Sequence, residues 1–218
     1  MFNSCSSLTT APAFPATTLS NDCYESALFG CTSLTAAPAL PATTLAFNCY
    51  GHMLKNCTSL TKAPALPATT LADYCYAGMF EGDISLTDAP KLPAQQLISY
   101  CYHYMFNGCS SLSCVVTDLT AWTIYCTAGW LQNVAQDGVF MCPAELPDTR
   151  GASNIPTNWT KLAPPLCFTL EDTDSPTDIY IRKDGSPTVV SLEFSDNGID
   201  WYDYDMTGSR GMSIPLDD

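Results

Sequence analysis

Basic residues are scarce in this chain of 218 residues, where eight Lys and Arg stand against 22 Asp and Glu for a net charge of −14. A protein neutralises nucleic-acid phosphate or anionic lipid with its own cations, so this composition argues against both as partners. The sequence also has no apolar run near the roughly 20 residues that a membrane-spanning helix needs, which excludes insertion into a bilayer. The charge favours solubility and, for a charged ligand, a cationic one.

Histidine is scarcer still, since only His52 and His103 occur. A Cys–His or Ser–His nucleophile requires a base within hydrogen-bond reach and a third group that orients it. The two histidines fall at different phases of the repeat described below, and no sequence feature positions such a partner. We therefore predict surface histidines, no enzymatic activity, no cofactor and no metal.

A period of 26 residues runs through the first half of the chain. The triplet Ser-Leu-Thr, or a near copy, begins at Ser7, Ser33, Ser59, Ser85 and Ser111. Residues 31–56 and 57–82 are identical at 18 of 26 positions without a gap. Such a period, with leucine and cysteine at fixed phase, is typical of a stacked solenoid whose coils bury their apolar faces only against one another.

Three columns of apolar residues predict the core of this solenoid. They are Leu8, Leu34, Leu60, Leu86 and Leu112; then Leu19, Leu45, Leu71 and Leu97; then Phe2, Leu28, Leu54, Phe80 and Phe106. Prolines at Pro12, Pro38, Pro64 and Pro90 should end a short strand, because proline has no N–H to extend the pairing. The following Thr-Thr-Leu-x-x-x-Cys-Tyr-x-x-Met-Phe spacing predicts a turn or two of helix or 3₁₀ helix. Each coil should thus hold a strand in a parallel sheet, a corner and a curved return.

The phrase Met-Phe-x-Gly-Cys-x-Ser-Leu-Thr recurs, whole or nearly so, at residues 1–9, 53–61, 79–87 and 105–113. It resembles the BspA-like leucine-rich repeat family over roughly the first half of the chain. The resemblance implies a parallel-sheet solenoid carried mostly on bacterial cell surfaces and used for adhesion to host or neighbouring-cell molecules, with relatives in phage. A departure from the family is the Ala-Pro-Ala-Leu-Pro variant, which replaces its usual small β-branched strand residues.

Cysteine is abundant, but its spacing indicates columns and not cross-links. One column is Cys5, Cys31, Cys57, Asp83 and Cys109, and a second is Cys23, Cys49, Cys75 and Cys101. Zinc sites use paired Cys-x₂₋₄-Cys units, and a disulfide framework rarely holds one fixed phase. We predict buried free thiols that act as small hydrophobes or bond the turn backbone, a role that the Asp83 carboxyl can share.

The chain divides by composition into regular leucine-rich repeats (1–112), degenerate coils with a C-terminal cap (113–165) and a small all-β module (166–218). Residues 118–136 predict an amphipathic helix with Trp122, Trp130, Leu131 and Val134 inward, and 138–143 and 158–164 predict two further strands of the same sheet. The N-terminal edge lies in mid-coil, so we expect it to be covered by further repeats or by another chain.

The third region carries a net charge of −9 and strand-like runs at 167–172, 177–183, 189–195, 200–205 and 211–215. Asn197-Gly198 predicts a type I′ hairpin turn. With about 53 residues this β-sandwich-like module is near the lower limit for folding alone, so it should dock on the solenoid or be cut short at Asp218. The acidic stretch 171–178 lacks the glycine and closing glutamate of an EF-hand loop, which favours a solvated turn over a cation site.

Partner-specific chemistry should lie where a column changes identity from coil to coil. Three such rows are Thr10, Ala36, Lys62 and Asp88; Asp22, Asn48, Tyr74 and Tyr100; and Ser26, His52, Gly78 and Tyr104. The predicted binding residues are Lys62, Tyr74, Asp88, Tyr100, Tyr102, His103 and Tyr104, which would stack on sugar rings or anchor a protein, although tyrosines packed between coils are the plain alternative.

Two function classes remain open. The first is a cell-surface or secreted adhesion module with a protein or glycan partner. The second is a structural spacer, such as part of a phage fibre or surface stalk, without a ligand of its own.

Overall fold

The computed structural model describes residues 2–123, 125–163, 179–183, 190–194 and 202–204. The chain divides into two compact units, Met1–Pro164 and Pro165–Asp218. Among the described residues no helix is long and apolar enough to cross a membrane.

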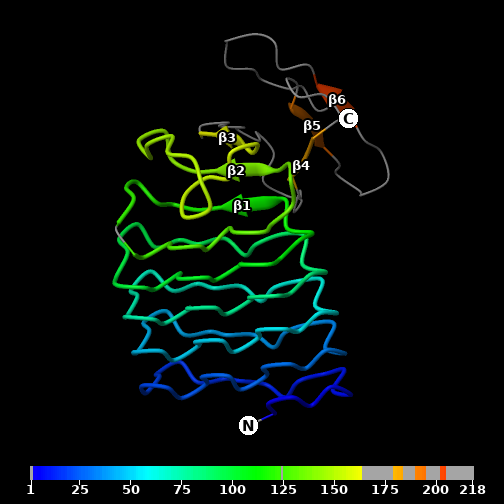
Figure 1. Cartoon of the computed structure of the whole chain (residues 1–218), viewed down its shortest axis with the longest axis vertical. Coiled ribbons are helices and arrows are strands. Elements are labelled where there is room, and N and C mark those ends of the chain that lie inside the picture. The colour runs from blue at the N-terminus through cyan, green and yellow to red at the C-terminus, as the bar shows by residue number, and fades with distance from the viewer. Residues whose placement is uncertain (1, 124, 164–178, 184–189, 195–201, 205–218) are drawn as a thin grey trace, which may run out of the picture. The chain divides into compact units, whose positions relative to one another are not determined.

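The first unit is a stack of coils that rises from the N-terminus to β3 (Figure 1). Consecutive coils pair through single parallel bridges between residues 26 apart, namely Thr10↔Ala36, Ala36↔Lys62, Thr44↔Thr70 and Asp88↔Cys114. The stack continues as a three-stranded parallel sheet of β1 (Cys114–Val116), β2 (Val139–Met141) and β3 (Thr160–Leu162), in that order. The strands predicted within 138–143 and 158–164 are therefore confirmed.

Proline explains why the first coils pair through bridges and not through full strands. Pro12, Pro38 and Pro64 follow the bridged residues by two positions and have no N–H to continue the ladder. The same position in the fifth coil is Val116, which keeps its N–H, and there the bridge widens into the three residues of β1. The parallel direction agrees with the sequence, but regular strands form only where proline is absent.

The return segments, residues 21–30, 47–56, 73–82, 99–108 and 125–133, are runs of turns and not the predicted helix or 3₁₀ helix. Their backbone N–H groups alternate in direction. The N–H of Cys49 donates to the carbonyl of Ala46 in its own coil at 3.3 Å, whereas the N–H of Tyr50 donates to Cys75 of the next coil at 3.0 Å. An α-helix would turn every N–H back along its own axis, so this division of donors between coils excludes it.

A left-handed residue at every fourth position makes this alternation possible. In the second coil these are Asn48, His52 and Asn56, with φ of 48°, 53° and 62°. The period of four places two side chains inward and two outward in turn, so that Cys49, Tyr50, Met53 and Leu54 are buried. The predicted helix over 118–136 is likewise wrong, although Trp130 and Leu131 are buried and Trp122 and Val134 pack against the core as predicted.

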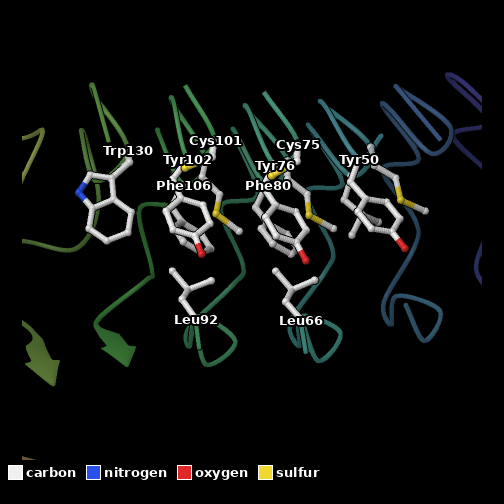
Figure 2. Packing of buried hydrophobic residues seen from close by; sticks show 14 of the residues in the cluster. Tyr50, Leu66, Cys75, Tyr76, Phe80, Leu92, Cys101, Tyr102, Phe106 and Trp130 are labelled. Atoms are coloured by element: carbon white, nitrogen blue, oxygen red, sulfur yellow. The ribbon is translucent and has the colours of Figure 1, made fainter. Parts of the chain in front are cut away.

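The interior is a set of like side chains stacked from coil to coil. The predicted leucine and phenylalanine columns are buried from the second coil onward, which confirms them as core. Beside them runs an inner aromatic stack of Tyr24, Tyr50, Tyr76, Tyr102 and Trp130, with centroid separations of 5.8, 5.8, 6.1 and 6.0 Å. Figure 2 shows the rings of Tyr50, Tyr76, Tyr102 and Trp130 in a row, with Phe80 and Phe106 alongside and Leu66 and Leu92 facing them.

The cysteine columns bond the backbone of the turns. The thiols of Cys31, Cys57 and Cys109 donate to carbonyls of the preceding coil at 3.1, 3.2 and 3.0 Å. These three cysteines and Cys49, Cys75 and Cys101 are buried free thiols, as predicted, whereas Cys5 and Cys23 at the N-terminal end of the stack are exposed.

Asp83 occupies the cysteine column in the fourth coil and is fully buried. Its Oδ1 accepts the N–H of Cys57 at 2.7 Å, which confirms that its carboxyl takes the backbone-bonding role. Its Oδ2 has no hydrogen-bond partner among the described residues. Burial raises the pKa of Asp83 well above the usual range of a carboxyl, and the bond from Cys57 opposes this only in part.

The second unit contains an antiparallel sheet of β4 (Ile179–Lys183), β5 (Val190–Phe194) and β6 (Tyr202–Tyr204), in that order. The antiparallel pairing of β5 with β6 confirms the strand partners of the predicted hairpin. The Asn197-Gly198 turn, the acidic stretch 171–178 and the runs at 167–172 and 211–215 lie outside the described residues.

Candidate binding surface

The outward positions of the return segments form one continuous side of the first unit, which we call the return face. It consists of the outward side chains of residues 21–30, 47–56, 73–82, 99–108 and 125–133. The inward positions of the same segments are filled by the stacked core. The return face therefore carries the side chains that differ from coil to coil.

An outer aromatic ladder of Phe47, Tyr74, Tyr100 and Tyr125 runs along the return face. Tyr74 and Tyr100 stack at 4.8 Å with an interplanar angle of 9°, and Tyr100 and Tyr125 stack at 5.7 Å and 17°. Phe47 meets Tyr74 edge-on at 5.8 Å. Exposure is 44% for Phe47, 36% for Tyr74 and 62% for Tyr125, so the ladder is a surface feature and not core.

Mutual stacking decides which parts of these rings a partner can reach. Both faces of Tyr100 are covered, one by Tyr74 and the other by Tyr125. What Tyr74 and Tyr100 offer to solvent is their edges and phenol groups. Tyr125 differs, because no described aromatic ring stacks on its second face.

His103 and Tyr104 extend the ladder sideways. His103 meets Tyr100 edge-on at 5.4 Å and Tyr104 at 4.2 Å with a tilt of 52°. Partial burial lowers the pKa of His103, an effect that the carboxylate of Glu81 opposes. His103 is therefore held in its neutral form at neutral pH, as a packed part of an aromatic group.

The charged side chains of the return face are mostly acidic. Lys55 is its one basic residue, and its ammonium group pairs with Glu81 at 2.7 Å. Asp22 accepts a hydrogen bond from the side-chain amide of Asn48 at 2.8 Å. Asp22, Glu25 and Asp73 are exposed and form no ion pair with any described residue.

The structure separates the predicted binding residues into three groups. Tyr74, Tyr100, His103 and Tyr104 come together on the return face. Lys62 and Asp88 lie instead on the bridge column, paired with Ala36 and Cys114, and take no part in this surface. Tyr102 is a correction, because it is fully buried in the inner aromatic stack between Tyr76 and Trp130.

Tyr125 is the ladder residue that the column comparison missed. The step from Tyr100 to Tyr125 is 25 residues and not 26, so a gapless comparison loses it. The signal is nonetheless present, since "YCYAGM" at residues 74–79 reappears as "YCTAGW" at residues 125–130. A comparison that allows one deletion aligns the two tyrosines.

The described residues contain no group of three or more His, Cys, Asp or Glu side chains that could hold a metal ion. A shallow depression of about 360 Å³ lies beside the last return segment, between residues 131–136 and 152–158. Its polar lining includes Gln132, Asn133, Gln136 and Asn158, carboxamides that are neither nucleophiles nor acids or bases. The outer aromatic ladder is the more distinctive surface.

No family model, no curated protein and no solved structure matches this chain.

Proposed function

We propose that this protein is a non-enzymatic recognition module, a leucine-rich-repeat solenoid of the BspA-like type that binds a protein or glycan partner through the outer aromatic ladder. The observation that carries the proposal is the exposure of Tyr74, Tyr104 and Tyr125 on the return face, while the tyrosines of the inner stack are buried. The side chains of the inner columns are already used in core packing. The outer ladder lies at the surface, where smaller polar residues would serve the core equally well.

Tyrosine suits this role physically. It offers a large amphipathic contact area and has few rotatable bonds to immobilise, which is why it is enriched at binding hot spots. Stacking in the outer ladder restricts the rings further before any partner arrives. A partner would therefore meet a surface that is already ordered, and the entropic cost of binding would be small.

The repeat phrase and its family resemblance favour a cell-surface or secreted location, or a place on a virion. We propose adhesion as the setting of the recognition. An array of glycans and of extracellular protein domains tests it, screened with the wild type and with Tyr100→Ala plus Tyr104→Ala. Lys62→Ala plus Asp88→Ala, on the bridge column, is the matched control. Loss of binding in the tyrosine variant but not in the control supports the proposal. Binding that is unchanged in the tyrosine variant rejects this surface as the binding site.

A structural spacer is the second candidate, and a separate observation favours it. Five N–H groups in each of the second and third return segments, such as those of Asn48 and Tyr74, donate across to the next coil. With the inner aromatic stack, this bonding would make a stiff rod. A spacer would bind nothing on the array, and stretching single molecules would show high resistance to unfolding that Tyr100→Ala plus Tyr104→Ala leaves unchanged.

A further inference from the structure

We propose that the outer aromatic ladder binds an arginine-containing basic segment of a partner protein. This inference rests on the recognition function proposed above and names the chemistry of its partner. It is carried by the combination of stacked tyrosines with unpaired carboxylates on one face.

Charge complementarity is the first argument. The return face carries Asp22, Glu25, Asp73 and Glu81 against Lys55 alone. Lys55 is already paired with Glu81, so the other three carboxylates keep their charge available to a ligand. Acidic side chains also lie beside the ladder, since Glu81 acts on His103 and Asp73 immediately precedes Tyr74. A cationic segment is attracted to such a surface, whereas an acidic one is repelled.

The stacking geometry is the second argument, and it weighs against a glycan. A sugar ring packs on the open face of an aromatic side chain. The faces of Tyr100 are covered, and Tyr74 shares one face with Tyr100 at 4.8 Å while the edge of Phe47 approaches it as well. Tyr125 at one end of the ladder and Phe47 at the other each have a face without a described ring partner. A row of sugar rings would thus find platforms only at the two ends of the ladder and not four in succession.

Arginine fits the uncovered ring face of Tyr125 and the unpaired carboxylates better than lysine does. Its planar guanidinium can form a cation–π contact with the face of Tyr125 that no described ring covers, on a residue that is 62% exposed. Its five N–H donors, set in a fixed fork, are directed at acceptors such as the phenol oxygen of Tyr100 and the carboxylate of Asp73. A lysine ammonium is a point charge that can satisfy the carboxylates but does not match the ring face.

Fluorescence anisotropy with labelled twelve-residue peptides tests the inference on the full chain. The probes alternate serine with arginine, with lysine, or with citrulline, which keeps the shape of arginine but has no charge. Cellohexaose, a neutral glycan, competes in a fourth arm. We expect binding of the arginine peptide that weakens with added salt, weaker binding of the lysine peptide, and neither binding of the citrulline peptide nor competition by cellohexaose.

Two pairs of variants separate the surface from general charge. Tyr125→Ala should weaken binding of the arginine peptide about two- to fivefold, the effect expected for loss of an exposed cation–π contact. Tyr125→Phe retains the ring face and should bind the peptide like the wild type. Asp73→Asn should also weaken binding, whereas Asp88→Asn removes the same charge on the bridge column and should not.

Equal losses from Asp73→Asn and Asp88→Asn would overturn the inference, because they would indicate attraction by net charge alone. Binding of citrulline peptide or glycan that depends on Tyr125 would overturn it too, but would leave the recognition function standing. If no probe and no array partner binds in a way that depends on the ladder, the recognition function fails with it.

Discussion

The ring of Tyr104 lies directly against Gly129 of the next coil, where a Cβ on the glycine would fall 2.3 Å from Cε1 of the tyrosine. The same relationship joins His52 to Gly78, where the corresponding distance to Nδ1 is also 2.3 Å. Both glycines have positive φ, 64° and 59°. Along this column a bulky side chain in one coil is accommodated by a glycine in the following one.

Gly129→Ala should therefore displace the Tyr104 ring and destabilise the protein. Urea unfolding followed by tryptophan fluorescence measures the loss. Gly108→Ala is the matched control, because Gly108 also has a positive φ, 79°. A Cβ on Gly108 would meet nothing closer than the backbone of Gly82 at 3.6 Å, which is an ordinary contact. The left-handed strain of about 1–2 kcal/mol is common to both variants. The prediction fails if Gly129→Ala costs no more than Gly108→Ala.

Asp83 should make the protein less stable as the pH rises. Its folded-state pKa is raised by burial, so the unfolded chain loses its proton first, near pH 4, and the folded state is progressively disfavoured until the pH passes the folded pKa. Asp83→Cys restores the column residue of Cys57 and Cys109. It should increase the free energy of unfolding at pH 7 by about 1–3 kcal/mol, because it removes a buried carboxyl oxygen without a partner.

The pH dependence provides the check on this assignment. The difference in stability between Asp83→Cys and the wild type should shrink below pH 4, where the carboxyl is neutral in both folded and unfolded states. Denaturation curves between pH 3 and pH 8 measure it. A difference that stays constant across this range would show that Asp83 is not the titrating group.

Tyr100 and Tyr102 are two positions apart, and their truncation should destabilise the protein to very different extents. Tyr102→Ala empties a fully buried site in the inner aromatic stack and should cost about 3–5 kcal/mol of stability. Tyr100→Ala acts on the return face and should cost less than about 1.5 kcal/mol, the scale of an aromatic pair contact. Thermal unfolding of the two variants compares them. Similar costs would place Tyr100 in the core and remove it from the binding surface.

The thiols should react in two classes in the folded protein. Cys5 and Cys23 are exposed and should be alkylated quickly by a water-soluble maleimide. Burial raises the pKa of Cys49 to about 11 and that of Cys101 to about 12, which suppresses the reactive thiolate as well as access. Peptide mapping after timed alkylation should find these two modified only after denaturant is added, and rapid labelling of either in the native protein would contradict the burial described here.

The sequence predicts the interior better than the backbone that supports it. A 26-residue period with apolar residues at fixed phase locates Leu60 or Phe80 in the core, because stacked coils leave no other place for a repeated apolar side chain. It does not reveal the form of the return segments, since Cys-Tyr-x-x-Met-Phe fits a helix as well as a turn of period four. The deciding feature is the sharing of N–H groups between coils, which involves no side chain.

The binding surface was only partly predictable for a related reason. Tyr100 and Tyr102 are two positions apart and look alike in the sequence, yet Tyr100 lies in the outer ladder and Tyr102 in the inner stack. Two residues inward and two outward is the rule, so position 102 follows 101 into the core while 103 and 104 turn outward. Without that rule, a cluster of tyrosines reads as one patch.

The uniform direction of the inter-coil hydrogen bonds has a consequence for how long such a molecule can be. Along the return segments, every N–H that leaves a coil points toward the C-terminal side, and the carbonyls that receive it point back. Each coil thus has a donor side and an acceptor side, and any copied block of 26 residues presents the same two sides to its neighbours. Duplicating residues 57–82 in tandem should therefore lengthen the stack by one coil without creating a new type of interface between coils. Gene duplication can thus adjust the length of such a molecule in steps of one coil.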